Sequence, residues 1–330
     1  MADTNMYTTA SNTYRTQSQN YFNKKLLATA VELLQMQRLC TLYPLPKNMG
    51  TKTVTMFKRK TSGNASDVKE LTEGTPDNNW SKTELESLDV TIKQYGDKSK
   101  MSDVASYTEL FNQLKLETER MGESCALKVD QLIMEEAVKN ATQKLYAGGN
   151  DFATLKGAEA SATNVLSCKK VLAISQLLKK KRAPKFAGGY YVAVLTPEQV
   201  YDLQQDADWK NLNVHNRGGK AIYKNEVGEI HGVKILETTA GWVESTAENT
   251  LDEAGDIFTG LFMGRDVLGS VDLAGAPSAR KPVFIHNNKA DKSDPLNQFQ
   301  TIGWKGFFAT KLLQPEWLVT VRTKSLMPNA

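Results

Sequence analysis

The residues from Ser106 to Ala147 follow a single helical pattern, which constrains the fold more than any other stretch of the chain. Apolar residues recur there at three- and four-residue steps, namely Tyr107, Phe111, Leu114, Met121, Cys125, Val129, Leu132, Ile133, Ala137 and Ala141. Ser106 and Glu109 form a capping-box pattern, and Gly148-Gly149 supplies a left-handed stop. A helix of roughly 40 residues is about 60 Å long, whereas a round protein of this length is about 50 Å across. The pattern therefore predicts a flat or elongated molecule.

Composition and charge are those of an ordinary soluble protein. The 330 residues are 40% hydrophobic and 24% charged, which is enough for a sizeable core and suggests about two domains. The net charge of +4 is small for this length, and no basic stripe is interleaved with aromatic residues. Residues 1–20 are polar, and no apolar run is long enough to span a membrane. We therefore expect a cytoplasmic protein that is neither secreted nor membrane-spanning.

Motifs for catalysis or metal binding do not occur in the sequence. Cys40, Cys125 and Cys168 are far apart and form no CxxC pair, so we expect thiols in the core. The three histidines stand alone, and there is neither a phosphate-binding glycine loop nor a nucleophile elbow. The sequence predicts no catalytic residues, no metal site, no cofactor and no enzyme activity.

The first hundred residues predict an arm, a helix and a long hairpin. Residues 1–20 are polar, as in a mobile arm, and Tyr21–Leu42 has the spacing of an amphipathic helix. Thr51–Arg59 and Leu88–Tyr95 have the alternation of strands, with a long polar segment between them. A two-stranded hairpin is not stable alone in water, so this one either folds back on its own core or lies on another chain. A disordered surface loop is the alternative.

The middle of the chain mixes helices and strands. Asp151–Ala160 is expected to be a connector and Thr163–Lys181 a helix. The cations Lys179–Arg182 follow at its end; they fit either a nucleic-acid contact or, more simply, the negative end of a helix dipole. After a buried strand at 190–195, Thr196 should cap a helix that runs to about Ala207, with Gln199 reaching back to the cap.

The last third of the chain predicts mainly strands. They lie within 221–239, at Ile257–Met263 and at Val267–Leu273; a polar loop at Pro277–Ala290 and two closing strands at Phe299–Leu313 and Trp317–Arg322 follow. The first closing strand places Ile302, Trp304 and Phe308 on one face and Phe307, Ala309 and Leu313 on the other. We expect the first of these faces to lie against the long helix.

An ordered set of sequence pieces resembles the phage N4-like major capsid proteins, a branch of the tailed-phage HK97-like capsid fold. The pieces are YFNKKLL, PLPKNMGTKTVTMFKR, LTEGTPDNN, VTIKQYGDKSKMSDV, the long helix ending KLYAGG, FAGGYYVAVLTPEQVYDLQQDADW, EIHGVKILETT, GRDVLGSVDLAG and DPLNQFQTIGWKGFFATKLLQPEWLVTV. They span roughly residues 21–321, nearly the whole chain.

The resemblance implies an α+β HK97-like major capsid fold with a defined division of the chain. The N-terminal arm would be 1–50 and the extended β-hairpin loop 51–98. A peripheral domain, 99–187 and 276–330, would carry the spine helix 106–147 with the closing strands beside it. An axial domain with a central sheet would occupy 188–275.

The resemblance also implies a function, the major capsid protein of a tailed double-stranded DNA bacteriophage. Copies of the chain would assemble as hexamers and pentamers into the icosahedral head, in the host cytoplasm. Scaffolding, decoration and portal proteins are further candidate partners, with non-specific contact to packaged DNA and no membrane. We expect intersubunit contacts at Phe57, Leu71, Trp80 and Tyr95. The alternative is a nucleic-acid-binding structural protein that uses its basic arm and Lys179–Arg182, which the mild net charge disfavours.

Overall fold

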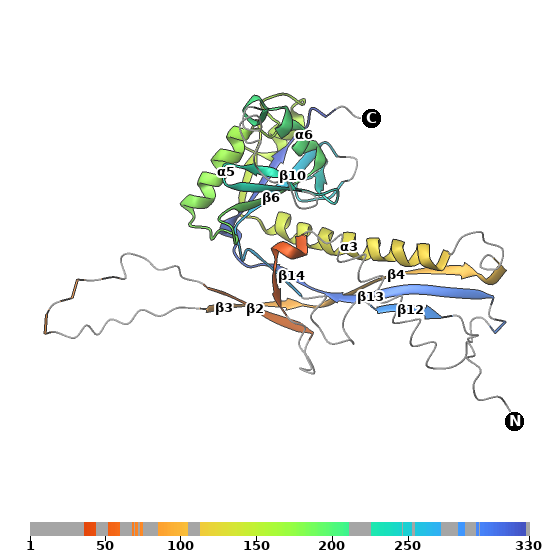
Figure 1. Ribbon diagram of the computed structural model, residues 1–330. Helices are drawn as coiled ribbons and strands as arrows, with labels where there is room; N and C mark the ends of the chain where they lie inside the picture. The colour runs from red at the N-terminus through yellow and green to blue at the C-terminus, as the bar shows by residue number, and fades with distance from the viewer. Residues whose placement is uncertain are drawn as a thin grey trace.

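The computed structural model describes residues 36–43, 52–59, 68, 70–71, 73–74, 85–104, 113–210, 226–245, 247–252, 255–271, 283–287, 295–296 and 298–327. Figure 1 shows an elongated molecule in which the long helix α3 lies between a narrow sheet and a lobe that carries α5 and α6, while the hairpin β2–β3 projects to one side. In the first half of the chain the elements are η1 (Met36–Leu39), β1 (Thr41–Tyr43), β2 (Thr53–Arg59), β3 (Leu85–Thr91), β4 (Lys93–Ser102), α3 (Gln113–Asn140), β5 (Gln143–Tyr146) and α4 (Phe152–Gly157). They continue with α5 (Cys168–Lys180), β6 (Tyr191–Leu195), α6 (Pro197–Gln205), β7 (Glu226–Ile230), β8 (Val233–Glu237), β9 (Trp242–Glu244), β10 (Ile257–Met263), β11 (Leu268–Val271), β12 (Val283–Asn287), β13 (Phe299–Phe308), β14 (Thr310–Leu312), η3 (Pro315–Trp317) and β15 (Leu318–Thr323).

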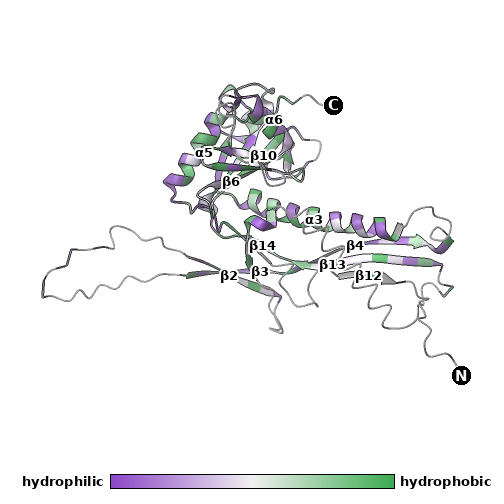
Figure 2. Cartoon of the chain, in the orientation of Figure 1, coloured by the Kyte–Doolittle hydropathy of each residue, from purple (hydrophilic) through white to green (hydrophobic). Residues whose placement is uncertain are grey.

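Helix α3 confirms the long apolar pattern and is buried along two successive parts of its length. Met121 and Cys125 pack against the narrow sheet, in a cluster with Trp304. Further along, Ile133 and Ala137 belong to the main core, which includes residues of β6 and β10. Figure 2 shows hydrophobic and hydrophilic residues alternating along α3, as its solvent-facing side requires. The helix therefore joins two sheets that would otherwise have separate cores.

The predicted helix is too long at its C-terminal end. Its expected start at Ser106 lies outside the described residues, and the described helix has 28 residues, or about 42 Å. It ends at Asn140, and Gln143–Tyr146 forms β5, which pairs in parallel with β15. Gly148, with φ of +81°, closes the turn after β5 rather than the helix. Residues 141–145 match helical spacing, but the strand ladder to β15 is a long-range interaction that this spacing does not reveal.

The narrow sheet has the order β12-β13-β4 and lies along the N-terminal part of α3 (Figure 1). Strand β13 pairs with β4 along its whole length, and Ile302, Trp304 and Phe308 face inward as predicted. Strand β13 ends at Phe308, and β14 begins at Thr310 after the single residue Ala309. Ala309 and Leu313 belong to a separate hydrophobic cluster beneath the hairpin. Strand β12 lies within the segment that we predicted as a polar loop, because the partner that makes it a strand, β13, is a separate segment later in the chain.

The lobe is built on a seven-stranded sheet in the order β5-β15-β10-β6-β8-β7, with β9 also paired to β10. Strand β6 is buried on both faces: Tyr191, Ala193 and Leu195 pack under α5 and α6, while Val192 and Val194 face the core with α3. We expected both closing strands beside the spine helix. The second one, β15, is an interior strand of this sheet, paired with β10 and β5, and its Leu318 belongs to the main core together with residues of α3. A domain boundary at residue 276 therefore separates β15 from the sheet that it belongs to.

Local signals correctly located several elements of the lobe. Thr196 caps α6, accepting a hydrogen bond from the Gln199 backbone N–H at 3.4 Å, and Pro197 is the first helical residue. The Gln199 side chain does not reach back to the cap. It donates instead to the Phe258 carbonyl and to Thr323 Oγ1, each at 2.9 Å. Because these partners lie on β10 and β15, Gln199 ties α6 to the sheet.

Three further expectations need correction at their boundaries. Most of the predicted helix Tyr21–Leu42 lies outside the described residues, but Thr41–Tyr43 is a strand that pairs in parallel with β11. The expected connector after α3 contains the short helix α4, which Asp151 caps through Thr154 N–H at 2.8 Å. Helix α5 begins later than the predicted start at Thr163, at Cys168.

Replacing Trp304 with alanine is expected to lower the free energy of unfolding by about 3–5 kcal/mol, because the ring is only 6% exposed and fills the cluster between α3 and the narrow sheet. Chemical denaturation of the two proteins measures this difference. Leu127→Ala is the matched control, since Leu127 is 51% exposed on the outer side of α3 and its loss should change stability by about 0.5 kcal/mol or less. A Trp304→Ala cost close to that of the control would mean that the ring is not buried in solution.

Candidate assembly surfaces

The base of the hairpin packs on its own chain. Strands β2 and β3 pair in antiparallel register from Thr53 with Thr91 to Arg59 with Leu85. Val54 and Met56 point inward and are buried against Ala309 and Leu313. Of the two arrangements left open by the sequence, folding back on its own core is thus correct for the base of the hairpin.

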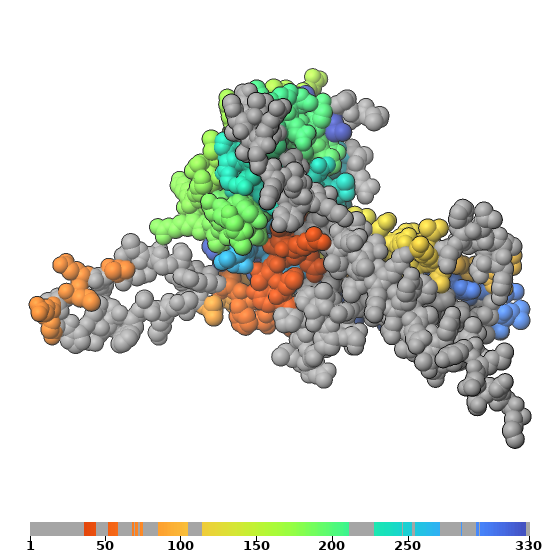
Figure 3. All heavy atoms as spheres, viewed as in Figure 1, coloured from red at the N-terminus to blue at the C-terminus, as the bar shows by residue number. Residues whose placement is uncertain are grey.

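The outer face and the far end of the hairpin are exposed. Phe57 is 56% and Leu85 is 68% exposed, and the register places them as diagonal neighbours on the same face. Leu71, at the far end, is 72% exposed. Figure 3 shows the described residues of the 68–74 segment (orange) at the end of the hairpin furthest from the rest of the molecule. An apolar pair and an apolar tip on a projecting hairpin are suited to contact with another molecule.

The four predicted contact residues therefore fall into different environments. Phe57 and Leu71 are exposed, and Trp80 lies outside the described residues. Tyr95 is half-buried and packs against the buried main core of its own chain. Burial, followed by the nearby Glu135 carboxylate, raises the pKa of Tyr95. A contact between Tyr95 and a neighbouring subunit stays a prediction.

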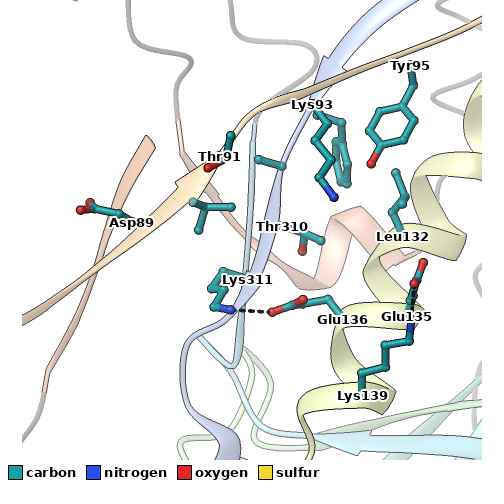
Figure 4. Close-up of a pocket in the computed structure, with 13 residues that line it drawn as sticks. Asp89, Thr91, Lys93, Tyr95, Leu132, Glu135, Glu136, Lys139, Thr310 and Lys311 are labelled. Carbon is teal, nitrogen blue, oxygen red and sulfur yellow. Dashed lines mark hydrogen bonds and ion pairs between the residues drawn. The ribbon is translucent and has the colours of Figure 1, made fainter. Parts of the chain in front are cut away.

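Tyr95 lines a hollow of about 330 Å³ between α3, the foot of the hairpin and β13–β14 (Figure 4). Two carboxylates of α3 face it, and each is next to a lysine: Glu135 lies 2.5 Å from Lys139 Nζ, and Glu136 lies 3.3 Å from Lys311 Nζ. Glu136 also accepts a hydrogen bond from the Leu312 backbone N–H at 3.4 Å. The contacts of Glu136 join α3 to β14, which indicates a structural groove rather than a pair of catalytic carboxylates.

The basic cluster at the end of α5 forms a helix stop, as the simpler interpretation predicted. Arg182 has a φ of +52°, and the following Ala183 N–H donates to the Leu178 carbonyl at 3.0 Å. This is the six-to-one bond of a Schellman motif. The side chains of Lys179, Lys180 and Arg182 are exposed. Their charges also suit the negative end of the helix dipole.

A buried ion pair in the lobe was not identified from the sequence. The side chains of Arg322 on β15 and Glu244 on β9 are both 0% exposed. Arg322 Nε donates to Glu244 Oε2 at 3.0 Å, and Nη2 donates to Oε1 at 3.2 Å. Trp242 Nε1 donates to the same Oε1 at 3.0 Å. The one available signal was an arginine inside the otherwise uncharged strand LVTVRT, but nothing in the sequence identifies its partner, which lies on a distant strand.

Further polar groups surround this pair. Arg322 Nη2 also donates to Asn249 Oδ1 at 2.8 Å. Glu248 receives hydrogen bonds from Lys144 Nζ and, at 3.0 Å, from the Tyr146 hydroxyl. Burial, together with the hydrogen bond to Glu248, raises the pKa of Tyr146 to about 12. Burial alone would raise the pKa of Glu248, but the hydrogen bonds from Lys144 and Tyr146 and the charge of Arg322 together lower it. Through Glu248 and Asn249, the network connects the segment after β9 to β5 and β15.

The described part of the chain offers little for metal or redox chemistry. Within it, no three His, Cys, Asp or Glu side chains lie close enough together to hold a metal ion. Cys40, Cys125 and Cys168 are free thiols, and burial raises the pKa of each of them. No helix of the described residues has the length and apolar content needed to cross a membrane.

Comparisons with known proteins identify the fold. No family model and no curated protein matches the sequence. Among solved structures, the chain is similar to the capsid of cyanophage P-SCSP1u, with a TM-score of 0.60 and 15% identity over 87% of each chain. It is also similar to the capsid of Ralstonia phage GP4, with a TM-score of 0.60 and 13% identity over 88% of each chain. For the head of Helicobacter pylori bacteriophage KHP40 the TM-score is 0.61 with 10% identity, over 86% of this chain and 88% of the other.

These similarities extend over most of this chain and most of each capsid chain. The protein therefore has the HK97-like fold of tailed-phage capsids, an α+β architecture, as the sequence predicted. At identities this low the comparison establishes the fold alone.

Proposed function

We propose that this chain is the major capsid protein of a tailed double-stranded DNA bacteriophage, and that it assembles into the icosahedral shell of the head. The observation that supports this most is the match to phage capsid chains over 86% to 88% of this sequence. The projecting hairpin adds support, because its exposed Phe57, Leu85 and Leu71 have no cover within the described part of the chain. In this proposal the protein acts by self-assembly and carries out no catalysis.

The finer assignments belong to the same proposal. Residues 1–50 would be the N-terminal arm, 51–98 the extended loop, 99–187 with 276–330 the peripheral domain and 188–275 the axial domain, with β5 and β15 extending into the axial sheet. The chain would belong to the N4-like branch and form hexamers and pentamers in the virion capsid, assembled in the host cytoplasm. Scaffolding, decoration and portal proteins are candidate partners, and contact with packaged DNA would be non-specific.

The nucleic-acid-binding alternative has less support. The cations Lys179–Arg182 take part in a helix stop, and the net charge of +4 is mild for 330 residues. A shell needs to tolerate DNA at its inner face without reading its sequence.

Electron microscopy and sedimentation of the purified wild-type chain, alone and with a co-expressed scaffolding protein, test the proposal. We expect closed shells, or rings of five and six subunits. A chain that stays strictly monomeric at high concentration under both conditions would overturn the proposed function.

A further inference from the structure

A group of cations at the surface of the lobe lies next to the end of α5. We call Lys179, Lys180, Arg182 and Lys185 the α5 basic patch; all four are exposed. Among the described residues, no acidic side chain lies within 4.0 Å of the charged groups of Lys179, Lys180 or Arg182. Two acidic residues of the lobe form ion pairs with cations outside the patch: Glu316 with Lys181 at 3.6 Å and Asp266 with Arg265 at 3.0 Å. Cations are favoured at the C-terminal end of a helix. Lys179, Lys180 and Arg182 nevertheless have no acidic partner in the described part of the chain.

The tip of the hairpin carries the opposite charge. In the sequence, DVKELTEGTPD at 67–77 has four acidic residues and one lysine, although the whole chain is at +4. The structure describes two of these acids, Glu70 and Glu73, which are exposed on either side of the exposed Leu71; we call these two residues the acidic tip. Leu172 on α5 is 39% exposed and lies two helical turns before Lys179, on the same side of the helix. The two surfaces are therefore complementary in charge.

The acidic tip and the α5 basic patch of one chain do not meet. Val54 and Met56 hold the base of the hairpin against Ala309 and Leu313, and the tip lies at the far end of the hairpin (Figure 3). Helix α5 lies on the lobe instead (Figure 1). Within the described part of one chain no ion pair joins Glu70 or Glu73 to Lys179, Lys180 or Arg182, so a contact between two copies of the chain is the arrangement to consider.

We propose that the acidic tip of one subunit binds the α5 basic patch of a neighbouring subunit, with Glu70 and Glu73 paired with Lys179, Lys180 and Arg182. This inference rests on the proposed function, because it needs subunits side by side in a shell. Single exposed ion pairs are weak and are screened by salt, but a shell repeats the contact at every subunit interface, so that small gains add up. Assembly should therefore weaken as salt is raised.

A charge-exchange experiment tests this pairing. One variant carries Lys179→Glu, Lys180→Glu and Arg182→Glu, a second carries Glu70→Lys and Glu73→Lys, and a third combines all five changes. We expect each of the first two to reduce the fraction of chains in shells at least tenfold, and the combined variant to recover most of it. The matched control, Lys98→Glu with Lys169→Glu and Lys210→Glu, changes exposed lysines outside the patch and should assemble like wild type.

Folding is checked separately, because glutamate at the C-terminal end of α5 opposes the helix dipole. Lys179→Gln with Lys180→Gln removes the charges without this penalty and should also reduce assembly. Circular dichroism shows whether each variant folds. If the variants fold and assemble like wild type, or if the combined variant does not recover, the pairing is wrong while the proposed function stands.

Two other results also have a clear meaning. If the patch variants lose binding to short double-stranded DNA but build normal shells, the patch is a nucleic-acid contact and the pairing is overturned. If the wild-type chain forms no shells at all, the proposed function fails and the pairing fails with it.

Discussion

Replacing residues 62–84 with a short glycine-serine turn is expected to leave the subunit folded and to prevent shell formation. The replacement leaves β2 and β3 intact, and with them Val54 and Met56, which attach the hairpin to the body. None of the described tip residues belongs to a core cluster. Thermal stability should therefore change little, while a contact surface that includes Leu71 is lost. Melting temperature and sedimentation of the same preparation measure both effects.

The reason for the loss of assembly is energetic. Ordering a loop costs about 1–2 kcal/mol per residue in backbone entropy, and only contacts can offset this cost. The described residues of the tip belong to no core cluster of their own chain. In the proposed shell, a neighbouring subunit would supply the contacts.

A full-length replacement of the same segment, 62–84, by glycine and serine is the matched control for loop length. It should fail to assemble as well, because the contacts rather than the length are missing. If the shortened chain builds normal shells, the hairpin tip has no role in assembly. If it unfolds, the tip belongs to the core of the subunit.

Arg322→Met is expected to lower the free energy of unfolding by about 3–5 kcal/mol. The change leaves the Glu244 carboxylate without its cation at a position that is 0% exposed, and an uncompensated buried charge is costly. Glu244→Gln should have an effect of the same order. Denaturant unfolding of the two variants and the wild type measures the differences.

The double variant Arg322→Met with Glu244→Gln should recover a large part of the loss. It removes both charges, and the glutamine keeps an acceptor for Trp242 Nε1. The matched control is Lys139→Ala, which breaks the more exposed pair with Glu135 and should cost about 1 kcal/mol or less. Single variants that cost no more than this control would show that the pair is not buried in solution.

Local patterns in the sequence were sufficient for much of the secondary structure. The second hairpin strand, predicted at Leu88–Tyr95, is divided between β3, which ends at Thr91, and β4, which begins at Lys93 and pairs with β13. Strand β2, the central part of α3, the buried strand β6, the capped start of α6 and β10 all lie where periodicity and capping residues predict them. Each of these signals depends on residues within about one helical turn or a few strand positions of one another. The inward face of Ile302, Trp304 and Phe308 followed from alternation along one strand. For the candidate surfaces, the sequence predicted an intersubunit contact at Leu71; the side chain is exposed, and the contact itself stays a prediction.

The tertiary structure decided the features that depend on partners far apart in the chain. Residues 143–146 match helical spacing but form a strand, because β15, near the other end of the chain, supplies their hydrogen bonds. The same pairing places β15 in the seven-stranded sheet. Arg322 and Glu244 meet only because β15 and β9 both pair with β10. The sequence determined which segments are helical, extended or apolar, since these properties arise from neighbouring residues. Only the folded chain determines which segments pair, because backbone hydrogen bonds between strands are alike whatever their side chains, and the choice of partner depends on how the whole core packs.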